Sequence, residues 1–351
     1  MKPLALNFLV VSLVLASGSA GYATPLTSGT SPEPPATTLA QQGRNPAEFP
    51  GYVEQLKAQA REAGFDQQTI DTAFTGVHFV DRVIKSDRGQ LENKVTLDDY
   101  LGRVLTPEKI QQARLYVQQY QNQLQPITDA SGVQTQYIVA LWALESHFGQ
   151  IQGKEEVVSA LATLAFEGRR EAFFTKELMA ALRIIQRQQM SAADLKGSWA
   201  GAMGQSQFMP SSFLNYGKDG NGDGRIDIWN NLDDVFASTA NYLQREGWRA
   251  GQGWGQEVIL PAGFDAQQAG LKTAQAKTAA QWLQSGVKLM HPDENRDAGQ
   301  RAWIITPQDG GGRSFMVYDN FRTLMHWNRS YYFAISIGMM ADAIVTQQTV
   351  Q

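Results

Sequence analysis

The chain has 351 residues, of which 43% are hydrophobic and 18% are charged, so a large globular core is expected. Its formal net charge of −4 argues against nucleic acid as a partner, because phosphate binding needs a basic face. The absence of cysteine excludes disulfides, thiol catalysis, zinc–thiolate sites and a lipid-modified cysteine.

The N-terminal segment is predicted to be an export signal. Lys2 supplies a positive charge, residues 4–16 are apolar, and small residues complete a cleavable signal peptide over residues 1–23. The apolar run is too short to span a bilayer comfortably. Residues 24–46 are rich in Pro, Ser, Thr and Gly, which is typical of a disordered linker. The sequence therefore predicts a soluble periplasmic protein without a membrane span.

Beyond the linker, apolar residues recur at helical spacing. One helical stretch contains Tyr52 and Phe74 with a break at Gly64, and a second is expected from Pro107 to about Leu124. An unbroken apolar run over residues 137–144 predicts a helix that is buried on all sides. Further helices are expected within residues 155–190, over 232–247 and over 330–345.

Glu145 stands at the C-terminal end of the predicted buried helix. Helical spacing places it on the same stripe as Ile138 and Trp142. Poor solvation there would raise its pKa, which is the property that a proton donor needs at neutral pH. The alternative is a carboxylate that ends a core helix and points to water. Other glutamates nearby lie in polar contexts and are expected to be solvated: Glu155, Glu156 and Glu167.

A glycine-rich segment over residues 201–212 lets the backbone approach a ligand closely. Ser198, Gln205 and Gln207 offer neutral hydrogen bonds there, which suit a sugar better than a charged ligand. The alternative is a buried turn whose glutamines satisfy backbone groups. The pair Arg169 and Arg170 is expected to form a solvated turn rather than a substrate clamp.

An aspartate-rich loop follows the glycine-rich segment. Asp219, Asn221 and Asp223 alternate with glycines, and Gly224 occupies the sixth position, as in an EF-hand-like calcium loop. The twelfth position departs from the pattern because it is Asn230 rather than glutamate. The alternative is a metal-free turn. The ligands of a structural Ca²⁺ would be Asp219, Asn221, Asp223, the carbonyl of Arg225, and either Asp233 or Asp234.

The residue pattern changes from helical spacing to short apolar runs after Trp248. Short apolar runs at residues 258–260, 302–305 and 315–318 alternate with glycine-rich turns, which is typical of the strands of a small sheet. Three glycines at residues 310–312 indicate a hairpin between the last two strands.

Together, these segments resemble the lytic transglycosylase B family from about Phe49 to the C-terminus. The resemblance rests on residues 143–149 (Ala-Leu-Glu-Ser-His-Phe-Gly), 160–170, 201–211 and 240–243, which match in order and spacing. It implies a mainly α (α+β) fold with a lysozyme-like helical core. The implied parts are an N-terminal helical domain (about 47–125), the core (about 126–250 and 321–351) and a small inserted antiparallel β domain (about 251–320).

The resemblance also implies an activity, namely cleavage of the MurNAc–GlcNAc β-1,4 bond of peptidoglycan with 1,6-anhydromuramoyl products. Glu145 would be the sole catalytic carboxylate, assisted by the acetamido group of the substrate, and no organic cofactor is implied. Two alternatives stay open: a goose-type-lysozyme-like hydrolase of the same bond, and a non-catalytic calcium-dependent wall-binding protein. The implied substrate-binding residues are Ser198, Met203, Gln205, Gln207, Phe208, Tyr242, Trp327 and Asn328.

One motif departs from the family pattern. The family often has Arg-Tyr-Asn near the C-terminus, whereas this chain has His326, Trp327 and Asn328. The family tyrosine is expected to reach toward the catalytic glutamate. An indole keeps one donor but cannot accept a hydrogen bond. We therefore predict that Trp327 stacks on sugar or packs near the cleft.

Overall fold

The computed structural model describes residues 44–89, 95–291, 297–308 and 310–346. The predicted signal peptide and most of the predicted linker lie outside these ranges. Where the description begins, Pro46–Glu48 form a short 3₁₀ helix, η1, whose N-cap is the side chain of Asn45. Among the described helices, none is both long enough and apolar enough to cross a bilayer.

Six helices form the first part of the described chain. The predicted break at Gly64 is confirmed, because this residue adopts a φ of 81° between two helices. The block predicted from Pro107 consists of two helices that meet at Tyr120. The helices are α2 (Phe49–Glu62), α3 (Gln67–Phe74), α4 (Asp81–Gly89), α5 (Leu97–Val104), α6 (Pro107–Gln119) and α7 (Gln121–Ser131).

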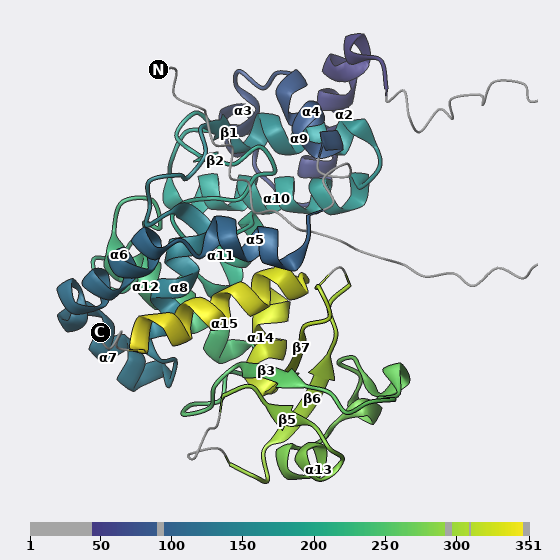
Figure 1. Cartoon of the computed structure of the whole chain (residues 1–351). Coiled ribbons are helices and arrows are strands. Elements are labelled where there is room, and N and C mark those ends of the chain that lie inside the picture. Colours follow the sequence, from purple (N-terminus) through teal and green to yellow (C-terminus); the bar gives the residue numbers. More distant parts are fainter. Residues whose placement is uncertain (1–43, 90–94, 292–296, 309, 347–351) are drawn as a thin grey trace, which may run out of the picture.

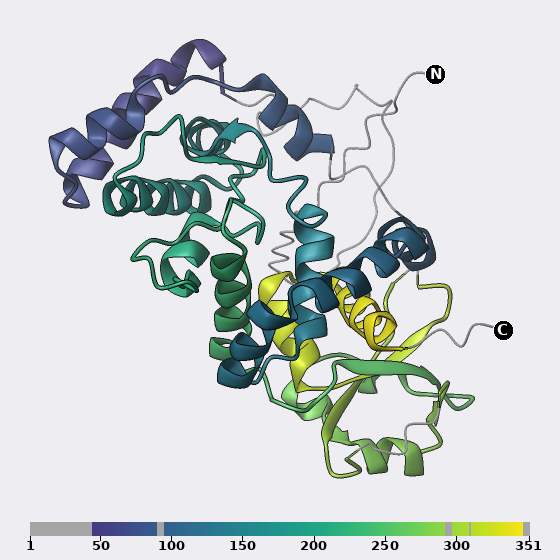
Figure 2. The same ribbon diagram turned by 90° about the vertical axis from the view of Figure 1, so that its left-hand side faces the viewer.

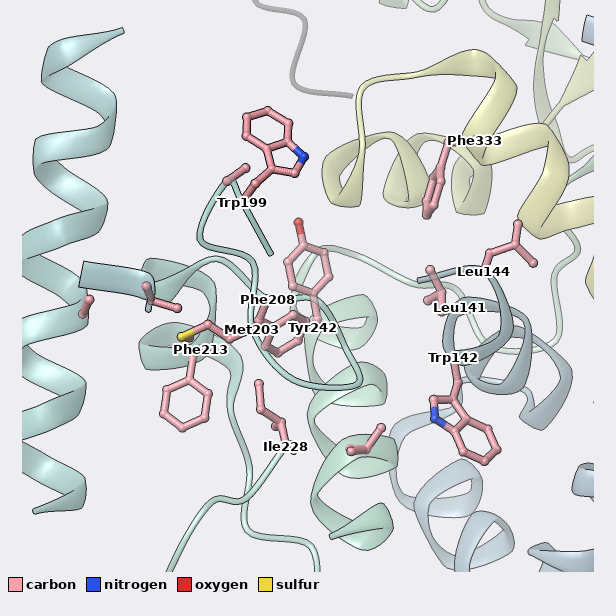
Figure 3. Packing of buried hydrophobic residues seen from close by; sticks show 14 of the residues in the cluster. Leu141, Trp142, Leu144, Trp199, Met203, Phe208, Phe213, Ile228, Tyr242 and Phe333 are labelled. Carbon is pink, nitrogen blue, oxygen red and sulfur yellow. The ribbon is translucent and has the colours of Figure 1, made fainter. Parts of the chain in front are cut away.

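The central helix α8 (Thr135–Ser146) is buried on all sides, as predicted. Residues 137–144 are all buried, because α8 packs against α6, α12 and the C-terminal helix α15 (Tyr331–Val345). Figure 3 shows Leu141 and Leu144 on the side of α8 that faces Phe333 of α15. The apolar run predicted this burial correctly, because a helix that is apolar on every side is stable only when it is surrounded by protein.

The remaining helices surround α8 and extend away from it. Figures 1 and 2 show α2, α3, α4, α9 and α10 at one end of the molecule and the larger sheet at the other, with α15 between them. A two-stranded antiparallel ribbon joins β1 (Glu155–Glu156) to β2 (Lys196–Gly197). The helices are α9 (Val157–Glu167), α10 (Glu171–Gln188), α11 (Pro210–Tyr216), α12 (Leu232–Arg245) and α14 (Asp319–Trp327).

A five-stranded antiparallel sheet has the strand order β4-β6-β7-β3-β5. The predicted hairpin joins β6 to β7 in the register Trp303↔Val317. Alternate residues point to opposite faces: Ile304 joins a small separate core, whereas Trp303 and Ile305 join the main helical core. The elements are β3 (Gly255–Ile259), β4 (Lys277–Thr278), β5 (Lys288–Leu289), β6 (Arg301–Ile305), β7 (Ser314–Val317), η2 (Ala266–Gln268), η3 (Thr273–Gln275) and α13 (Ala279–Gln284).

Candidate active site

Glu145 lies in the last turn of α8, at a sharply bent helix end. His147 and Phe148 have φ angles of 50° and 57°, and Gly149 has a φ of 80°. The Phe148 N–H donates to the carbonyl of Trp142, which closes the helix. Two successive non-glycine residues in the left-handed region store conformational strain, and such strain is often found at functional sites.

The Glu145 carboxyl receives a hydrogen bond from a helix far away in the sequence. Trp327, at the end of α14, donates its indole N–H to Glu145 Oε1 at 2.7 Å. Burial raises the pKa of Glu145 to about 8, and the bond from Trp327 opposes this rise in part because it favours the charged form. The carboxyl is therefore predominantly protonated at neutral pH, and it is not the fully solvated helix end of the alternative interpretation.

The surroundings of Glu145 also disfavour the charged forms of two neighbouring basic side chains. The carboxyl lines a small hollow of about 30 Å³ together with Lys109, His147 and apolar groups. Burial lowers the pKa of Lys109, and burial followed by the charge of Lys109 lowers the pKa of His147. In the part of the chain that the structure describes, no second carboxylate lines this hollow.

Trp327 is held by two other aromatic side chains. Its ring centroid lies 5.2 Å from that of Phe208 and 4.7 Å from that of Tyr242. Figure 3 shows Phe208 and Tyr242 side by side, on the glycine-rich segment and on α12. These contacts point the indole N–H at Glu145. Trp327 therefore makes the hydrogen bond to the glutamate that is expected of the family tyrosine.

A second contact fixes the end of α14. His326 Nδ1 lies 2.8 Å from Glu246 Oε2, and the hydroxyl of Tyr216 donates to Glu246 Oε1. Glu246 caps the C-terminus of α12, which also carries Tyr242. The Glu246 carboxylate therefore connects His326, next to Trp327 on α14, to the helix α12 that carries Tyr242.

The glycine-rich segment is ordered by its own side chains. The Ser198 hydroxyl accepts hydrogen bonds from the N–H groups of Ala200 and Ala202. Met203 is fully buried and exchanges two backbone hydrogen bonds with Phe208. The structure thus places Ser198 and Met203 within the wall of the site, where they support Phe208.

Gln205 connects this segment to α8. Its Oε1 accepts from the Trp142 indole at 2.7 Å, and its Nε2 donates to the Trp229 carbonyl at 2.9 Å. A Cβ atom on Gly149 would lie 2.2 Å from Gln205 Oε1, so this contact requires glycine at the helix end. Both polar atoms of the Gln205 amide thereby have a partner within the protein, in line with the alternative of a glutamine that satisfies neighbouring groups.

Gln207 and Asn328 retain unused polar atoms. Gln207 has a φ of 49°, and its Nε2 donates to the carbonyls of Gln152 and Gly204. Asn328 Oδ1 is buried and, like the indole N–H of Trp199, has no hydrogen-bond partner among the described residues. Buried unpaired polar atoms favour a polar ligand that would complete them.

Tyr100 of α5 also lies at the site, although sequence reasoning did not identify it. Burial raises the pKa of Tyr100 to about 12, and the negative charge of Glu145 adds to this rise. Its ring lies 5.7 Å from that of Tyr332 on α15. The eight-residue amphipathic helix α5 carries no motif that would single out this tyrosine.

One sequence expectation outside the site is wrong, and another holds only in part. Arg169 and Arg170 lie in a turn and Arg169 is exposed, as expected, but both guanidinium groups bind Asp87, whose side chain is 5% exposed. Glu167 is not solvated, since its buried carboxylate accepts from Arg169 Nε at 2.7 Å. Long-range ion pairs allow these charges to lie within the protein. Glu155 and Glu156 are also paired, with Arg82 and Lys196 respectively.

The aspartate-rich loop is held by its own carboxylates. Asp219 accepts from the N–H groups of Gly222 at 2.6 Å and Gly224 at 2.8 Å. Asp234 is fully buried, and its two oxygens accept from the N–H groups of Gly220 and Asp227. The carboxylate of Asp233 accepts no hydrogen bond from the described residues. Among those residues, no three or more acidic, histidine or cysteine side chains are placed so that they could hold a metal ion.

Comparison with known proteins decides the family. Residues 48–342 match the family described as "Transglycosylase SLT domain". The chain belongs to this family. The transglycosylase is 28% identical over 326 residues to the membrane-bound lytic murein transglycosylase B of Escherichia coli (strain K12), with 88% of this chain and 87% of that protein covered.

Solved structures agree with this assignment. SltB3 from Pseudomonas aeruginosa, in complex with NAG-NAM-pentapeptide, is 38% identical with a TM-score of 0.79, over 84% of this chain and 79% of that one. The Escherichia coli lytic transglycosylase Slt35, in complex with calcium, is 29% identical with a TM-score of 0.71, over 84% and 92% of the two chains. The predicted family, an enzymatic activity and the lysozyme-like, mainly α fold are therefore confirmed.

Proposed function

We propose that the transglycosylase cleaves the β-1,4 bond between N-acetylmuramic acid and N-acetylglucosamine in peptidoglycan, with Glu145 as its only acid and base. The observation that carries this proposal is the isolation of Glu145: a carboxyl with a pKa near 8 lines a hollow without a second carboxylate among the described residues. Glycosidases that use two carboxylates place the second one within about 10 Å of the first.

In the first step, Glu145 gives its proton to the bridging oxygen while the bond from this oxygen to the anomeric carbon breaks. The carbonyl oxygen of the substrate's 2-acetamido group bonds to the anomeric carbon and takes the place of a protein nucleophile. Glu145 becomes a carboxylate, and the Trp327 N–H, 2.7 Å away, stabilises the new charge.

In the second step, the Glu145 carboxylate takes the proton of the muramoyl 6-hydroxyl. The 6-oxygen bonds to the anomeric carbon as the bond to the acetamido oxygen breaks, and a 1,6-anhydro ring results. Glu145 is again protonated and no water is consumed. The burial that raises its pKa supports both roles, since the group must give and regain one proton near neutral pH.

The remaining site residues are proposed to hold the glycan. Phe208, Tyr242 and Trp327 present an aromatic wall, and aromatic rings suit the apolar faces of sugars. Gln207 Oε1 and Asn328 Oδ1 have no hydrogen-bond partner among the described residues, and both are suited to hydroxyl and amide groups of the substrate. Ser198, Met203 and Gln205 are proposed to contribute indirectly, by shaping the backbone of this wall.

We also propose that the aspartate-rich loop binds a structural Ca²⁺. Oxygen donors suit this ion, and Gly224 has the φ of 87° that the tight turn requires. The side chains of Asp219, Asn221 and Asp223 and the carbonyl of Arg225 would be ligands. Asp233 fits the closing position better than Asp234, because both oxygens of Asp234 already accept backbone hydrogen bonds. Bound calcium would stabilise the loop and take no part in proton transfer.

For localisation, we propose a soluble periplasmic enzyme. The support is the signal-like start, the missing cysteine and the absence of a membrane-spanning helix among the described residues. Recovery of the intact N-terminus from detergent-dependent membrane fractions would contradict this proposal.

Mass spectrometry of digested peptidoglycan tests the reaction. Wild-type enzyme should release muropeptides with 1,6-anhydromuramoyl ends, which lack one water relative to the products of a hydrolase. Glu145→Gln should bind sacculi without cutting them, with a loss of at least about 10²–10⁴-fold in rate. Reducing muramic ends alone would support the goose-type hydrolase, and near wild-type turnover by Glu145→Gln would refute the role of Glu145.

A further inference from the structure

A large cavity opens on the other side of the loop that follows α8. Its volume is about 870 Å³, which is within the range of ligand-binding cavities. The loop after Glu145, the end of α10, the ribbon strand β2 and the second half of the aspartate-rich loop line it. Ile151, a residue that is 43% exposed, lines both this cavity and the hollow that holds Glu145. The cavity is therefore a neighbour of the catalytic cleft.

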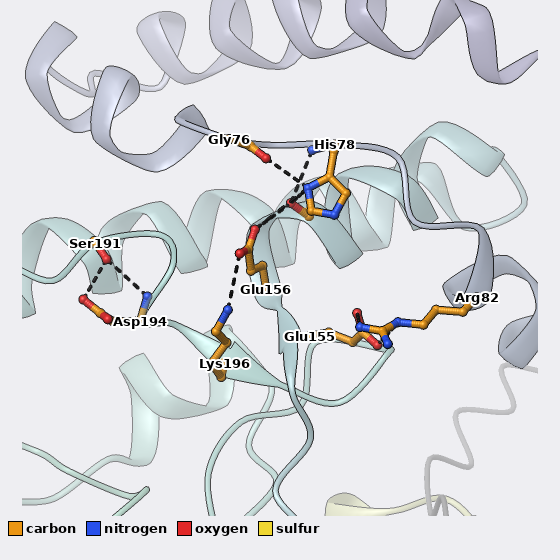
Figure 4. A network of polar contacts seen from close by, with 9 residues as sticks. Gly76, His78, Arg82, Glu155, Glu156, Ser191, Asp194 and Lys196 are labelled. Atoms are coloured by element: carbon orange, nitrogen blue, oxygen red, sulfur yellow. Dashed lines mark hydrogen bonds and ion pairs between the residues drawn. The ribbon is translucent and has the colours of Figure 1, made fainter.

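The cavity has two cationic side chains without an ion-pair partner. Lys154 and Arg225 are both exposed, and neither forms a salt bridge with any described residue. Lys196, the third cation of the lining, lies 3.3 Å from Glu156, as Figure 4 shows. Asp223 lies near Arg225 and feels its charge, whereas no acidic neighbour is recorded for Lys154 among the described residues. In a chain with a formal net charge of −4, such positive charge beside a cavity favours an anionic ligand.

The acidic groups of the lining are occupied by other donors. Asp194 accepts from the Ser191 hydroxyl at 2.7 Å (Figure 4). Asp227 accepts from the N–H groups of Trp229 and Asn230, both at 2.9 Å. These carboxylates therefore compete only weakly with a ligand for Lys154 and Arg225.

The cavity also offers apolar surface. The indole N–H of Trp229 donates to the Lys196 carbonyl at 3.0 Å, so the ring presents carbon rather than a free donor. Met190 and Ile151 add further apolar surface to the lining. A suitable ligand thus combines carboxylates with short aliphatic side chains, and this combination describes an acidic peptide.

We propose that this cavity binds the stem peptide of peptidoglycan, with Lys154 and Arg225 holding its carboxylates while the glycan lies at Glu145. The proposal rests on the proposed function, because the stem peptide is covalently attached to the muramic acid that is cut. This attachment gives the peptide a high effective concentration, so weak contacts are sufficient to select strands that carry it. Lys154 and Arg225 are accordingly specificity residues rather than catalytic ones.

The first test compares two substrates: intact sacculi, and the same glycan strands after an N-acetylmuramoyl-L-alanine amidase has removed the peptides. Lys154→Glu should lower kcat/KM on peptide-bearing strands by roughly tenfold, the size of a hydrogen bond to a charged group. On peptide-free strands its kcat/KM should stay within about twofold of wild type. The matched control is Lys288→Glu, an exposed lysine of β5 far from the cavity lining, which should change neither value.

The second test needs no turnover and uses the Glu145→Gln variant. Stem peptides released by the amidase are added with a carbodiimide, which joins carboxylates to amines in contact. Mass spectrometry should find the peptide on Lys154 in clear excess over Lys288. Equal labelling of the two lysines, or equal losses by Lys154→Glu on both substrates, or no loss on either, would overturn the proposal. A failure of the proposed function would appear separately, as missing anhydro products from the wild type.

Discussion

The hydrogen bond from Trp327 to Glu145 leads to a quantitative prediction for Trp327→Phe. This change keeps an aromatic ring but removes the indole donor to Glu145 Oε1, which lies 2.7 Å away and is the only one among the described residues. A hydrogen bond to a charged group is worth about 1.5–3 kcal/mol, which equals about one to two pKa units. Because the bond favours the carboxylate, its loss raises the pKa of Glu145 above its present value of about 8.

Two changes in kinetics should follow. The alkaline limb of kcat/KM should move upward by about one to two pH units, since Glu145 must start the reaction protonated. At neutral pH, kcat should fall by roughly tenfold, because the carboxylate formed in the first step loses its donor. Release of soluble muropeptides from sacculi, measured across neutral and alkaline pH, gives both quantities.

Trp327→Tyr is the control for this experiment. Its hydroxyl can donate to the same oxygen, so activity and pH profile should stay close to those of the wild type. A Trp327→Phe variant with an unmoved alkaline limb and full kcat would refute the reasoning, and the bond would then have no function in catalysis.

Three further changes have defined outcomes. Burial raises the pKa of Glu145 from its usual 4.5 to about 8, so the free energy of unfolding falls as pH rises between these values. At pH 8, Glu145→Gln should therefore melt at a higher temperature than the wild type. A difference in melting temperature that persists undiminished below pH 4.5 would contradict this cause. Calcium at a hundredfold excess over its dissociation constant should add about 2.7 kcal/mol of stability, seen as a raised melting temperature that Asp219→Asn abolishes; an unchanged melting temperature of metal-free protein on adding calcium would exclude the site. Glu246→Ala should lower kcat by roughly threefold to tenfold with little change in KM, because it releases His326 and the end of α14. Steady-state kinetics in which KM alone changes would contradict this positioning role.

Local patterns in the sequence predicted the fold wherever burial leaves a periodic signal. The run over residues 137–144 predicted α8, and the short apolar run over residues 302–305 predicted a strand of the small sheet. The helix α5 was missed although Leu97, Leu101 and Val104 recur at helical spacing after the N-cap Thr96. The split of the block after Pro107 into two helices at Tyr120 was also missed, since no glycine or proline marks it.

The candidate site was predictable only in part, because its contacts join distant segments. The position of Glu145 followed from one helix, but its donor Trp327 lies 182 residues away in the chain. The same limit explains the error at Glu167 and the unforeseen ion pairs of Arg169, because both depend on partners elsewhere in the chain. Tyr100 was missed for this reason as well.

The packing of α8 against α15 has a consequence for the biogenesis of the enzyme. A helix that is apolar on all sides cannot reach its final environment until the last helices have been synthesised and have docked. Contacts between segments so far apart close slowly, because the chain must first lose the entropy of a long loop. Glu145 thus acquires both its buried environment and the Trp327 donor late in folding. If Glu145 is the catalytic acid proposed above, we expect the incomplete chain to be inactive and its wall-degrading activity to arise only once the whole core has formed.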